Sequence, residues 1–299
     1  MEKIKIAFTH PYRVEHNNVF NEFNLLTPKN DGVWNNLVHV RDVYDADWII
    51  ACDFISPDLD LKKINMEKVI FVQREPPWFQ TPRSPRARLL AKHKYGYTLG
   101  NSYMFAGWSF PSTYKEMENF KRKKRTKKVC AIVTNKRMCP GHLQRLSFIK
   151  YFCNKFPNVL DVYGIGMDKE GIGQNYKGQS IFGDKAKLEW LQQYDYALCL
   201  ENGQANGFFT EKINDAFMTH TVPIYWGAPD IKRYFPENSY YTIDINTSDS
   251  IKKLLQIIST PVEKDILKNL KISRNRIMQE YNWWASIERI INSINASNN

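Results

Sequence analysis

The sequence contains no apolar run that approaches the roughly 20 residues a helix needs to cross a bilayer. Its start, MEKIKIAFT, passes straight into a strand pattern, without the apolar stretch and cleavage site of a signal peptide. We therefore expect a soluble, cytoplasmic protein whose contact with membranes is peripheral at most.

Cysteine and histidine are scarce and scattered. The five cysteines are odd in number and no two have CxxC spacing, which argues against a disulfide framework or a zinc site. Cys52, Cys130 and Cys199 lie in apolar, strand-like runs, so we expect small buried side chains in a reducing compartment. The six histidines show no metal-ligand spacing, and the sequence predicts no metal site.

Positive charge is plentiful. The net charge of +11 and the isoelectric point of about 9.3 favour an anionic partner: nucleic acid, an acidic membrane or a phosphorylated small molecule. The densest basic run, residues 121–128, contains no aromatic side chain, which disfavours a nucleic-acid-binding module. The 299 residues, 43% of them hydrophobic, suffice for one large domain or two ordinary ones with a sizeable core.

Short apolar runs alternate with helical patterns in the first half. The expected strands are KIKIAFT, DWIIACD, KVIFVQRE and YGYTLGN, and RARLLAKH is expected to be helical. This alternation predicts a parallel sheet in a Rossmann-like domain over residues 1–114. Residues 115–128 then change in composition. They include KRKKRTKK and are interpreted as a basic linker, with a surface for anionic lipid or acidic glycan left open as an alternative.

The second half repeats the alternation over residues 129–282. The expected strands are VCAIVTN, VLDVYGIG, YALCLEN, TVPIYWG and YYTIDI. A helix is expected to begin near Pro140, because proline suits the first helical turn. The pattern predicts a second doubly wound domain, followed by a last helix within residues 283–299. The fold class is thus α/β, with two Rossmann-like domains facing a cleft, and such clefts are favoured ligand sites.

One segment, Cys199–Pro229, concentrates the chemistry: CLENGQANGFFTEKINDAFMTHTVPIYWGAP. It predicts a strand–loop–helix–strand unit with charged residues at the edge where such sheets bind ligands. Thr210 is a suitable N-cap, and a helix N-terminus attracts phosphate. Lys212 in the first turn opposes the helix dipole unless an anion lies beside it. The residues alone leave a plain capped helix and a phosphate site equally open.

The order of these motifs resembles the donor-binding signature of the α1,3-fucosyltransferases of glycosyltransferase family 10, especially the Helicobacter-type bacterial members across FFTEKINDAFMTHTVPIYWGAP. The resemblance implies a GT-B fold, GDP-fucose as donor, inversion at the anomeric carbon and no required cofactor. It implies that Lys212 holds the diphosphate, that Glu211 binds ribose or fucose hydroxyls, and that Asn202 is the family's donor-site asparagine. Phe208 stands where the family usually has tyrosine, so a hydroxyl contact to the donor is missing.

Two further residues are candidates. Arg145 shares a helical face with Ile149 and Phe152, which fits either a snorkelling arginine or a phosphate clamp, and the resemblance favours the clamp. Glu75 ends the apolar run VIFVQ before two prolines, as a solvated loop residue or as a base for the acceptor hydroxyl. The resemblance favours the base.

Some tempting features are interpreted as structural. Asp45-Ala46-Asp47 looks like the DxD metal motif of other glycosyltransferases, but it stands at a helix-to-strand turn. His10 and His142 are left open as residues that line the cleft or merely end and begin elements.

The resemblance, together with these residues, therefore implies an inverting glycosyltransferase that moves fucose from GDP-fucose to a hydroxyl of an acceptor glycan. The N-terminal domain would bind the acceptor and the C-terminal domain the donor, with the last helix returning to the N-terminal domain. Transfer of another nucleotide sugar is the main alternative, and a basic nucleic-acid-binding protein is a weaker one. The expected partners are the nucleotide sugar and a glycan, without nucleic acid, and peripheral contact with anionic membrane stays open.

Overall fold

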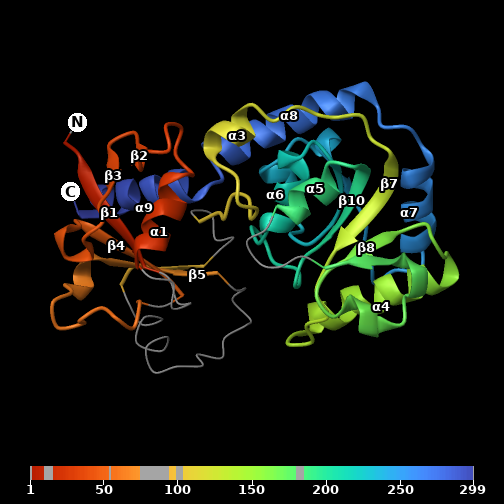
Figure 1. The fold of residues 1–299 in the computed structure, drawn as a ribbon, viewed down its shortest axis with the longest axis horizontal. Coiled ribbons are helices and arrows are strands. Elements are labelled where there is room, and N and C mark those ends of the chain that lie inside the picture. The colour runs from red at the N-terminus through yellow and green to blue at the C-terminus, as the bar shows by residue number, and fades with distance from the viewer. Residues whose placement is uncertain are drawn as a thin grey trace. The chain divides into compact units, whose positions relative to one another are not determined.

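The computed structural model describes residues 2–9, 16–53, 55–74, 94–98, 104–179 and 185–298 (Figure 1). The chain forms two compact units. Unit 1 comprises Met1–Phe105, Ser112–Asn119 and Tyr281–Asn299, and unit 2 comprises Ala106–Pro111 and Phe120–Glu280. These bounds differ from the predicted ones around residues 106–119, because a short segment of the first half is bound to unit 2.

Unit 1 is built on a sheet of order β2-β3-β1-β4-β5-β6. Its strands are β1 (Ile4–Thr9), β2 (Val33–Trp34), β3 (Leu37–His39), β4 (Trp48–Cys52), β5 (Val69–Gln73) and β6 (Gly96–Thr98). All neighbours pair in parallel except β2 and β3. The described helices of this unit are α1 (His16–Asn24), α3 (Tyr114–Glu118) and α9 (Trp283–Asn298). The four expected strands are present, whereas β2 and β3 were not predicted.

The last helix contributes to the core of unit 1. Trp284 on α9 is fully buried, and its indole Nε1 donates a hydrogen bond to the Phe23 carbonyl over 3.0 Å. Its ring meets that of Phe8 edge-on at 5.6 Å between centroids. Another residue of α9, Glu288, accepts a hydrogen bond of 3.1 Å from Trp34 Nε1. Helix α9 is therefore an integral part of this unit, although it is last in the sequence.

Unit 2 contains a parallel sheet of order β12-β11-β10-β7-β8-β9. Its strands are β7 (Lys127–Ile132), β8 (Asp161–Tyr163), β9 (Tyr176–Gly178), β10 (Tyr194–Leu200), β11 (Val222–Trp226) and β12 (Tyr241–Thr242). Its helices among the described residues are α4 (Pro140–Lys155), α5 (Ala186–Leu191), α6 (Glu211–Met218), α7 (Ser250–Ser259) and α8 (Lys264–Gln279). The strand order reverses between β7 and β10, and sheets of this kind bind ligands at such a switch point.

The basic run is more than a solvated connector. Helix α3 and the start of β7 take up part of residues 115–128. Between them, Arg125 donates hydrogen bonds to the carbonyls of Thr219 at 2.6 Å and His220 at 2.9 Å, and to that of Gln192. Because carbonyls of unit 2 hold this guanidinium, the run is anchored along unit 2.

The predicted burial of Cys52, Cys130 and Cys199 is confirmed, and all five cysteines are buried and free. Asp45 and Asp47 both bind Lys5, through an ion pair of 3.0 Å and a backbone hydrogen bond of 2.8 Å, so the DxD-like pair has a structural role. None of the helices in the described ranges is long and apolar enough to span a membrane.

Candidate functional site

The carboxyl ends of the parallel strands of unit 2 share one edge of the sheet, and helix α4 begins unusually close to it. A Cβ added to Gly141, in the first turn of α4, would lie 2.1 Å from the carbonyl oxygen of Asn202, which follows β10. The Cys139 thiol donates to the same carbonyl over 3.2 Å. Only glycine permits this contact, which joins the segments after β7 and β10 at the switch point.

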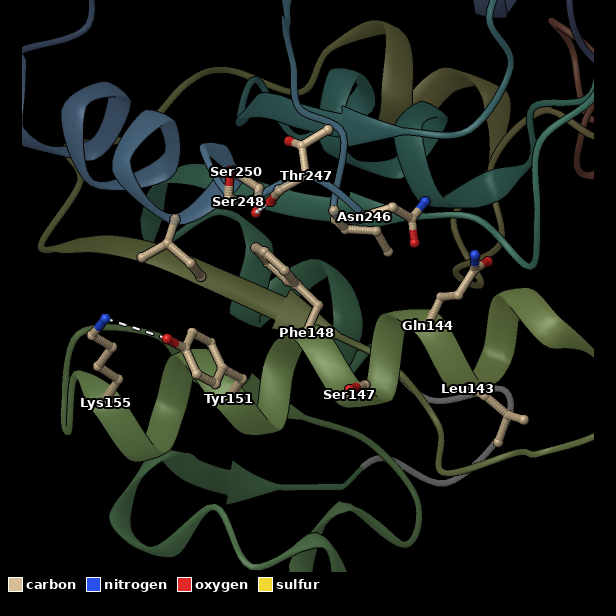
Figure 2. Close-up of a pocket in the computed structure, with 12 residues that line it drawn as sticks. Leu143, Gln144, Ser147, Phe148, Tyr151, Lys155, Asn246, Thr247, Ser248 and Ser250 are labelled. Carbon is tan, nitrogen blue, oxygen red and sulfur yellow. Dashed lines mark hydrogen bonds between the residues drawn. The ribbon is translucent and has the colours of Figure 1, made fainter.

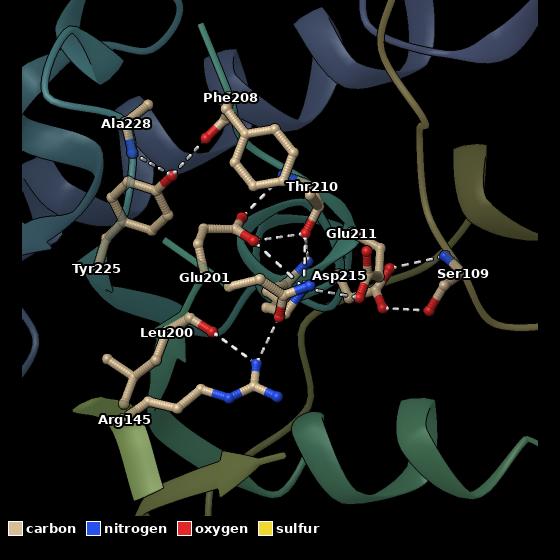
Figure 3. Close-up of polar contacts among 12 residues, drawn as sticks. Ser109, Arg145, Leu200, Glu201, Phe208, Thr210, Glu211, Asp215, Tyr225 and Ala228 are labelled. Carbon is tan, nitrogen blue, oxygen red and sulfur yellow. Dashed lines mark hydrogen bonds and ion pairs between the residues drawn. The ribbon is translucent and has the colours of Figure 1, made fainter. Parts of the chain in front are cut away.

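Arg145 lies across this switch point. Its Nη1 donates to Asn202 Oδ1 at 2.8 Å and reaches the Leu200 carbonyl at 3.5 Å (Figure 3). The residue is only 2% exposed, so its guanidinium does not extend into water. The snorkelling interpretation is therefore wrong. Asn202 and Arg145, chosen separately from the sequence, lie together.

A buried carboxylate organises the start of helix α6. Glu201 is fully buried, and its two oxygens accept hydrogen bonds of 2.8 Å from the backbone N–H and the hydroxyl of Thr210. Thr210 in turn caps α6, as predicted, by accepting from the Lys212 N–H. No role for Glu201 was predicted from the sequence. Its position directly after the apolar run 196–200 was the signal that could have indicated one.

Lys212 binds both acidic neighbours. Its Nζ lies 3.2 Å from Glu201 Oε2, 3.2 Å from Glu211 Oε1 and 2.9 Å from Thr210 Oγ1. Burial opposes the charge of this lysine, but Glu201 and Glu211 outweigh it and raise its pKa to about 12. Burial also opposes the charge of Glu211 and by itself would raise the pKa of this carboxyl, yet Lys212 and Lys187 lower that pKa to about 2. The pair is therefore charged and largely enclosed, unlike the surface charges of a plain capped helix.

A second cluster lies one turn further along α6. The fully buried Asp215 accepts hydrogen bonds from the Ser109 N–H at 2.8 Å and the Ser109 hydroxyl at 2.7 Å (Figure 3). Lys187 Nζ lies 2.5 Å from Asp215 Oδ2. Burial raises the pKa of Asp215, and Lys187 opposes that rise. No role was predicted for these three residues from the sequence. The spacing of Asp215 from Glu211, four positions on one helix, was the available signal.

Phe208 and Tyr225 are interior residues of unit 2. The Phe208 ring is 1% exposed, and the Tyr225 hydroxyl lies 3.5 Å from the Phe208 carbonyl. That hydroxyl also accepts a hydrogen bond of 2.9 Å from the Ala228 N–H, so it fixes the loop after β11. The structure thus places the Phe208 ring in the core beside the α6 cluster.

Of the histidine and base candidates, His142 alone lies within the described residues. His142 is 2% exposed, its Nδ1 accepts from the Met138 N–H at 3.2 Å, and burial together with Arg145 lowers its pKa to about 4. It is therefore a neutral, buried residue at the start of α4. Glu75 and His10 lie outside the described residues.

A groove of about 660 Å³ lies on the other side of α4 (Figure 2). Its walls come from one face of α4 and from the segment that leads into α7; they include Leu143, Tyr151, Asn246 and Thr247. Arg145, Asn202, Glu211 and Lys212 do not line it. The groove and the charged cluster are separate features of unit 2.

The cluster brings three cations and three carboxylates to the start of one helix: Arg145, Lys187, Lys212, Glu201, Glu211 and Asp215. A helix N-terminus with enclosed cations suits a phosphate or diphosphate. A carboxylate that stays ionised can accept hydrogen bonds from hydroxyl groups. The arrangement can therefore hold a ligand that carries both phosphates and hydroxyls.

Comparisons with known proteins agree with this chemistry. The family model described as glycosyltransferase family 10 (fucosyltransferase), C-terminal part, matches residues 122–298. Alpha-(1,3)-fucosyltransferase FucT of Helicobacter pylori is 37% identical over 92 residues, which are 31% of this chain and 18% of that protein. GDP-fucose protein O-fucosyltransferase 3 of Danio rerio is 27% identical over 125 residues, 41% of this chain and 27% of that protein. The chain thus spans less than a third of these relatives.

Among solved structures, a DNA-modifying β-glucosyltransferase superposes with a TM-score of 0.53 at 11% identity, covering 96% of this chain and 99% of the other. At this identity the likeness shows the fold alone. Together with the two parallel-sheet α/β units, it confirms the predicted GT-B fold.

Proposed function

Because the chain belongs to glycosyltransferase family 10, the fucosyltransferases, we propose that it transfers fucose from GDP-fucose to a hydroxyl group of an acceptor glycan. The observation that carries this proposal is the enclosed cluster of Arg145, Asn202, Glu211 and Lys212 at the start of α6. The names of the two relatives, a fucosyltransferase and a GDP-fucose-dependent one, support the donor.

In this proposal the donor lies at the carboxyl edge of the unit 2 sheet. Lys212 and Arg145 bind the diphosphate, assisted by the positive end of the α6 helix dipole. Glu211 accepts hydrogen bonds from ribose or fucose hydroxyls, and Asn202 orients Arg145 through their 2.8 Å hydrogen bond. Phe208 supports the loop from the interior, because its ring is buried.

The reaction we propose is a single displacement with inversion. The acceptor oxygen forms a bond to the anomeric carbon while the bond from that carbon to the diphosphate oxygen breaks. Glu75 takes the proton of the acceptor hydroxyl, and GDP leaves with the electron pair of the broken bond. Lys212 and Arg145 stabilise the negative charge that develops on the leaving diphosphate, which is the task a metal ion performs elsewhere.

Glu75→Gln tests the base. The variant keeps the size of the side chain but cannot accept a proton, so turnover should fall by roughly 10²-fold or more, whereas GDP binding stays at the wild-type level. Steady-state kinetics with GDP-fucose and calorimetry with GDP measure the two quantities. Wild-type turnover in this variant would remove Glu75 from the mechanism.

The proposed function is tested by thermal unfolding with GDP, UDP or a single-stranded oligonucleotide, followed by labelled GDP-fucose on a glycan array. We expect GDP alone to raise the Tm and label to reach the glycans. A shift with UDP alone would indicate another nucleotide sugar. A shift with the oligonucleotide alone would overturn the proposal in favour of nucleic-acid binding.

A further inference from the structure

A lysine outside the family-like motif is held next to the proposed donor site. Lys187, on α5, contacts Asp215 Oδ2 at 2.5 Å and Ser109 Oγ at 3.0 Å. Asp215 is fully buried and receives two further hydrogen bonds from Ser109. The Lys187 side chain itself is 21% exposed, so its ammonium lies at the border between the core and the site. Its position is therefore fixed by one fully buried partner, Asp215, and by the exposed Ser109.

Glu211 is the neighbour that this lysine can influence. Asp215 stands four positions after Glu211 on α6, and residues at that spacing lie on the same face of a helix. A cation that contacts Asp215 is consequently close to the Glu211 carboxylate, and Lys187 helps to keep the pKa of Glu211 low. The other charged groups around Glu211 are Lys212 and Asp215 on α6 and Glu201 at the end of β10.

The ammonium group of Lys212 has too few N–H groups to keep all its present contacts when a donor phosphate also binds to it. An ammonium has three N–H donors, and here they are directed to Thr210, Glu201 and Glu211. A phosphate oxygen must displace one of these three contacts. Glu201 is fully buried, so loss of its counter-charge would be costly, whereas the Glu211 side chain is 34% exposed. Of the two carboxylates, Glu211 is therefore the one that Lys212 can release at the lower cost.

We propose that Lys187 is a positioning residue for the donor site: anchored by Asp215 and Ser109, it holds the Glu211 carboxylate in place when Lys212 turns to the donor diphosphate. This inference rests on the proposed function. It predicts that the Lys187 charge matters more for donor binding than for the fold of the free protein.

The test uses Lys187→Met, Lys187→Arg and the double variant Lys187→Met/Asp215→Asn. Lys187→Met alone leaves the buried Asp215 carboxylate without its counter-charge and can therefore unfold the protein. The double variant removes both charges of the ion pair, so we expect it to fold even in that case. We expect the KM for GDP-fucose to rise about 10-fold in Lys187→Met and in the double variant, as for the loss of a charge-assisted contact, with recovery in Lys187→Arg. Lys253→Met, an exposed lysine on α7, is the control for net charge and should be unchanged.

A double-mutant cycle with Glu211→Gln identifies the route of the effect. If Lys187 acts through Glu211, adding Lys187→Met/Asp215→Asn to Glu211→Gln should raise KM by less than 2-fold. An undiminished effect in that background, or a wild-type KM in the Lys187→Met/Asp215→Asn variant, would overturn the proposal. If the wild-type protein binds neither GDP nor GDP-fucose, the proposed function fails and this inference fails with it. If the wild-type protein binds GDP-fucose and the Lys187 variants have the same KM as the wild type, only the proposed role of Lys187 is contradicted.

Discussion

The guanidinium of Arg145 is held in one orientation by its neighbours. Its guanidinium is enclosed between the segment that follows β7 and Asn202, and the 2.8 Å contact to Asn202 Oδ1 fixes its plane. A planar guanidinium can bind two oxygens of a diphosphate at once, which a lysine ammonium cannot do in the same geometry. The identity of this residue should therefore matter beyond its charge.

Arg145→Lys should weaken GDP binding by about 10- to 100-fold, because a charge-assisted hydrogen bond contributes about 1.5–3 kcal/mol. Calorimetry with GDP measures this loss. Lys150→Arg, an exposed residue on the same helix, is the matched control and should bind GDP normally. Normal GDP affinity of Arg145→Lys would show that Arg145 only joins the two segments.

Glu211 should make the stability of the protein sensitive to acid. Its pKa is about 2 in the folded protein against a usual 4.5, so its stabilising contribution is present above about pH 4.5 and is lost as the pH falls toward 2. The raised pKa values of Glu201 and Asp215 act in the opposite direction, because their protonation in acid favours the folded state. Glu211→Gln should thus lose less stability than the wild type between about pH 5 and pH 3. Urea unfolding at both pH values measures this, and equal acid losses would contradict it.

At the scale of elements, the start of α4 depends on one glycine. Glycine-to-alanine exchange in a helix usually stabilises by about 1 kcal/mol. At Gly141 the added Cβ would instead lie 2.1 Å from the Asn202 carbonyl oxygen, and such overpacking costs about 1–3 kcal/mol.

Gly141→Ala should consequently lower the free energy of unfolding and weaken GDP binding together, since Arg145 and Asn202 move apart. Denaturant unfolding and calorimetry on the same preparation provide both readouts. A variant that is more stable than the wild type and binds GDP normally would mean that the two segments are not in close contact.

The sequence was informative where an element has a strong local pattern. The apolar runs of β1, β4, β5, β7, β10 and β11, the proline at the start of α4 and the Thr210 cap were all predicted and are present. The strands β2, β3 and β9 were not predicted, whereas β6, β8 and β12, which are equally short, were predicted because each lies within a longer apolar run. Lys187, Ser109 and Asp215 come from three separate segments, and only the folded chain brings them together. Glu75 remains a prediction.

At the scale of the whole molecule, the proposed donor site and the core of unit 1 are built from different residues. The proposed donor ligands all belong to unit 2, whereas Trp284 of α9 belongs to unit 1. Burial of a tryptophan is a major contribution to the stability of any unit that encloses it.

Trp284→Ala should destabilise the protein by about 3–5 kcal/mol, because it empties a fully buried site and leaves the Phe23 carbonyl without its indole donor. Differential scanning calorimetry measures the loss. GDP affinity at a temperature where the variant is folded should stay within about 2-fold of the wild type. Trp283→Ala, which removes a partly exposed neighbour, should cost less. A large change in GDP affinity for Trp284→Ala would show that the units depend on each other.

The chain passes between the two units at four points: residues 105–106, 111–112, 119–120 and 280–281. Recombination at a single point therefore cannot replace the whole of unit 2, which carries the proposed donor site, in this chain. A chimera cut only at residue 120 would combine α6 with a foreign segment in place of Ala106–Pro111 and would lose the Ser109 partner of Asp215. Chimeras that carry 106–111 together with 120–280 should retain the contacts of Asp215 with both Ser109 and Lys187. Single-crossover chimeras should fold without the Ser109 contacts to α6.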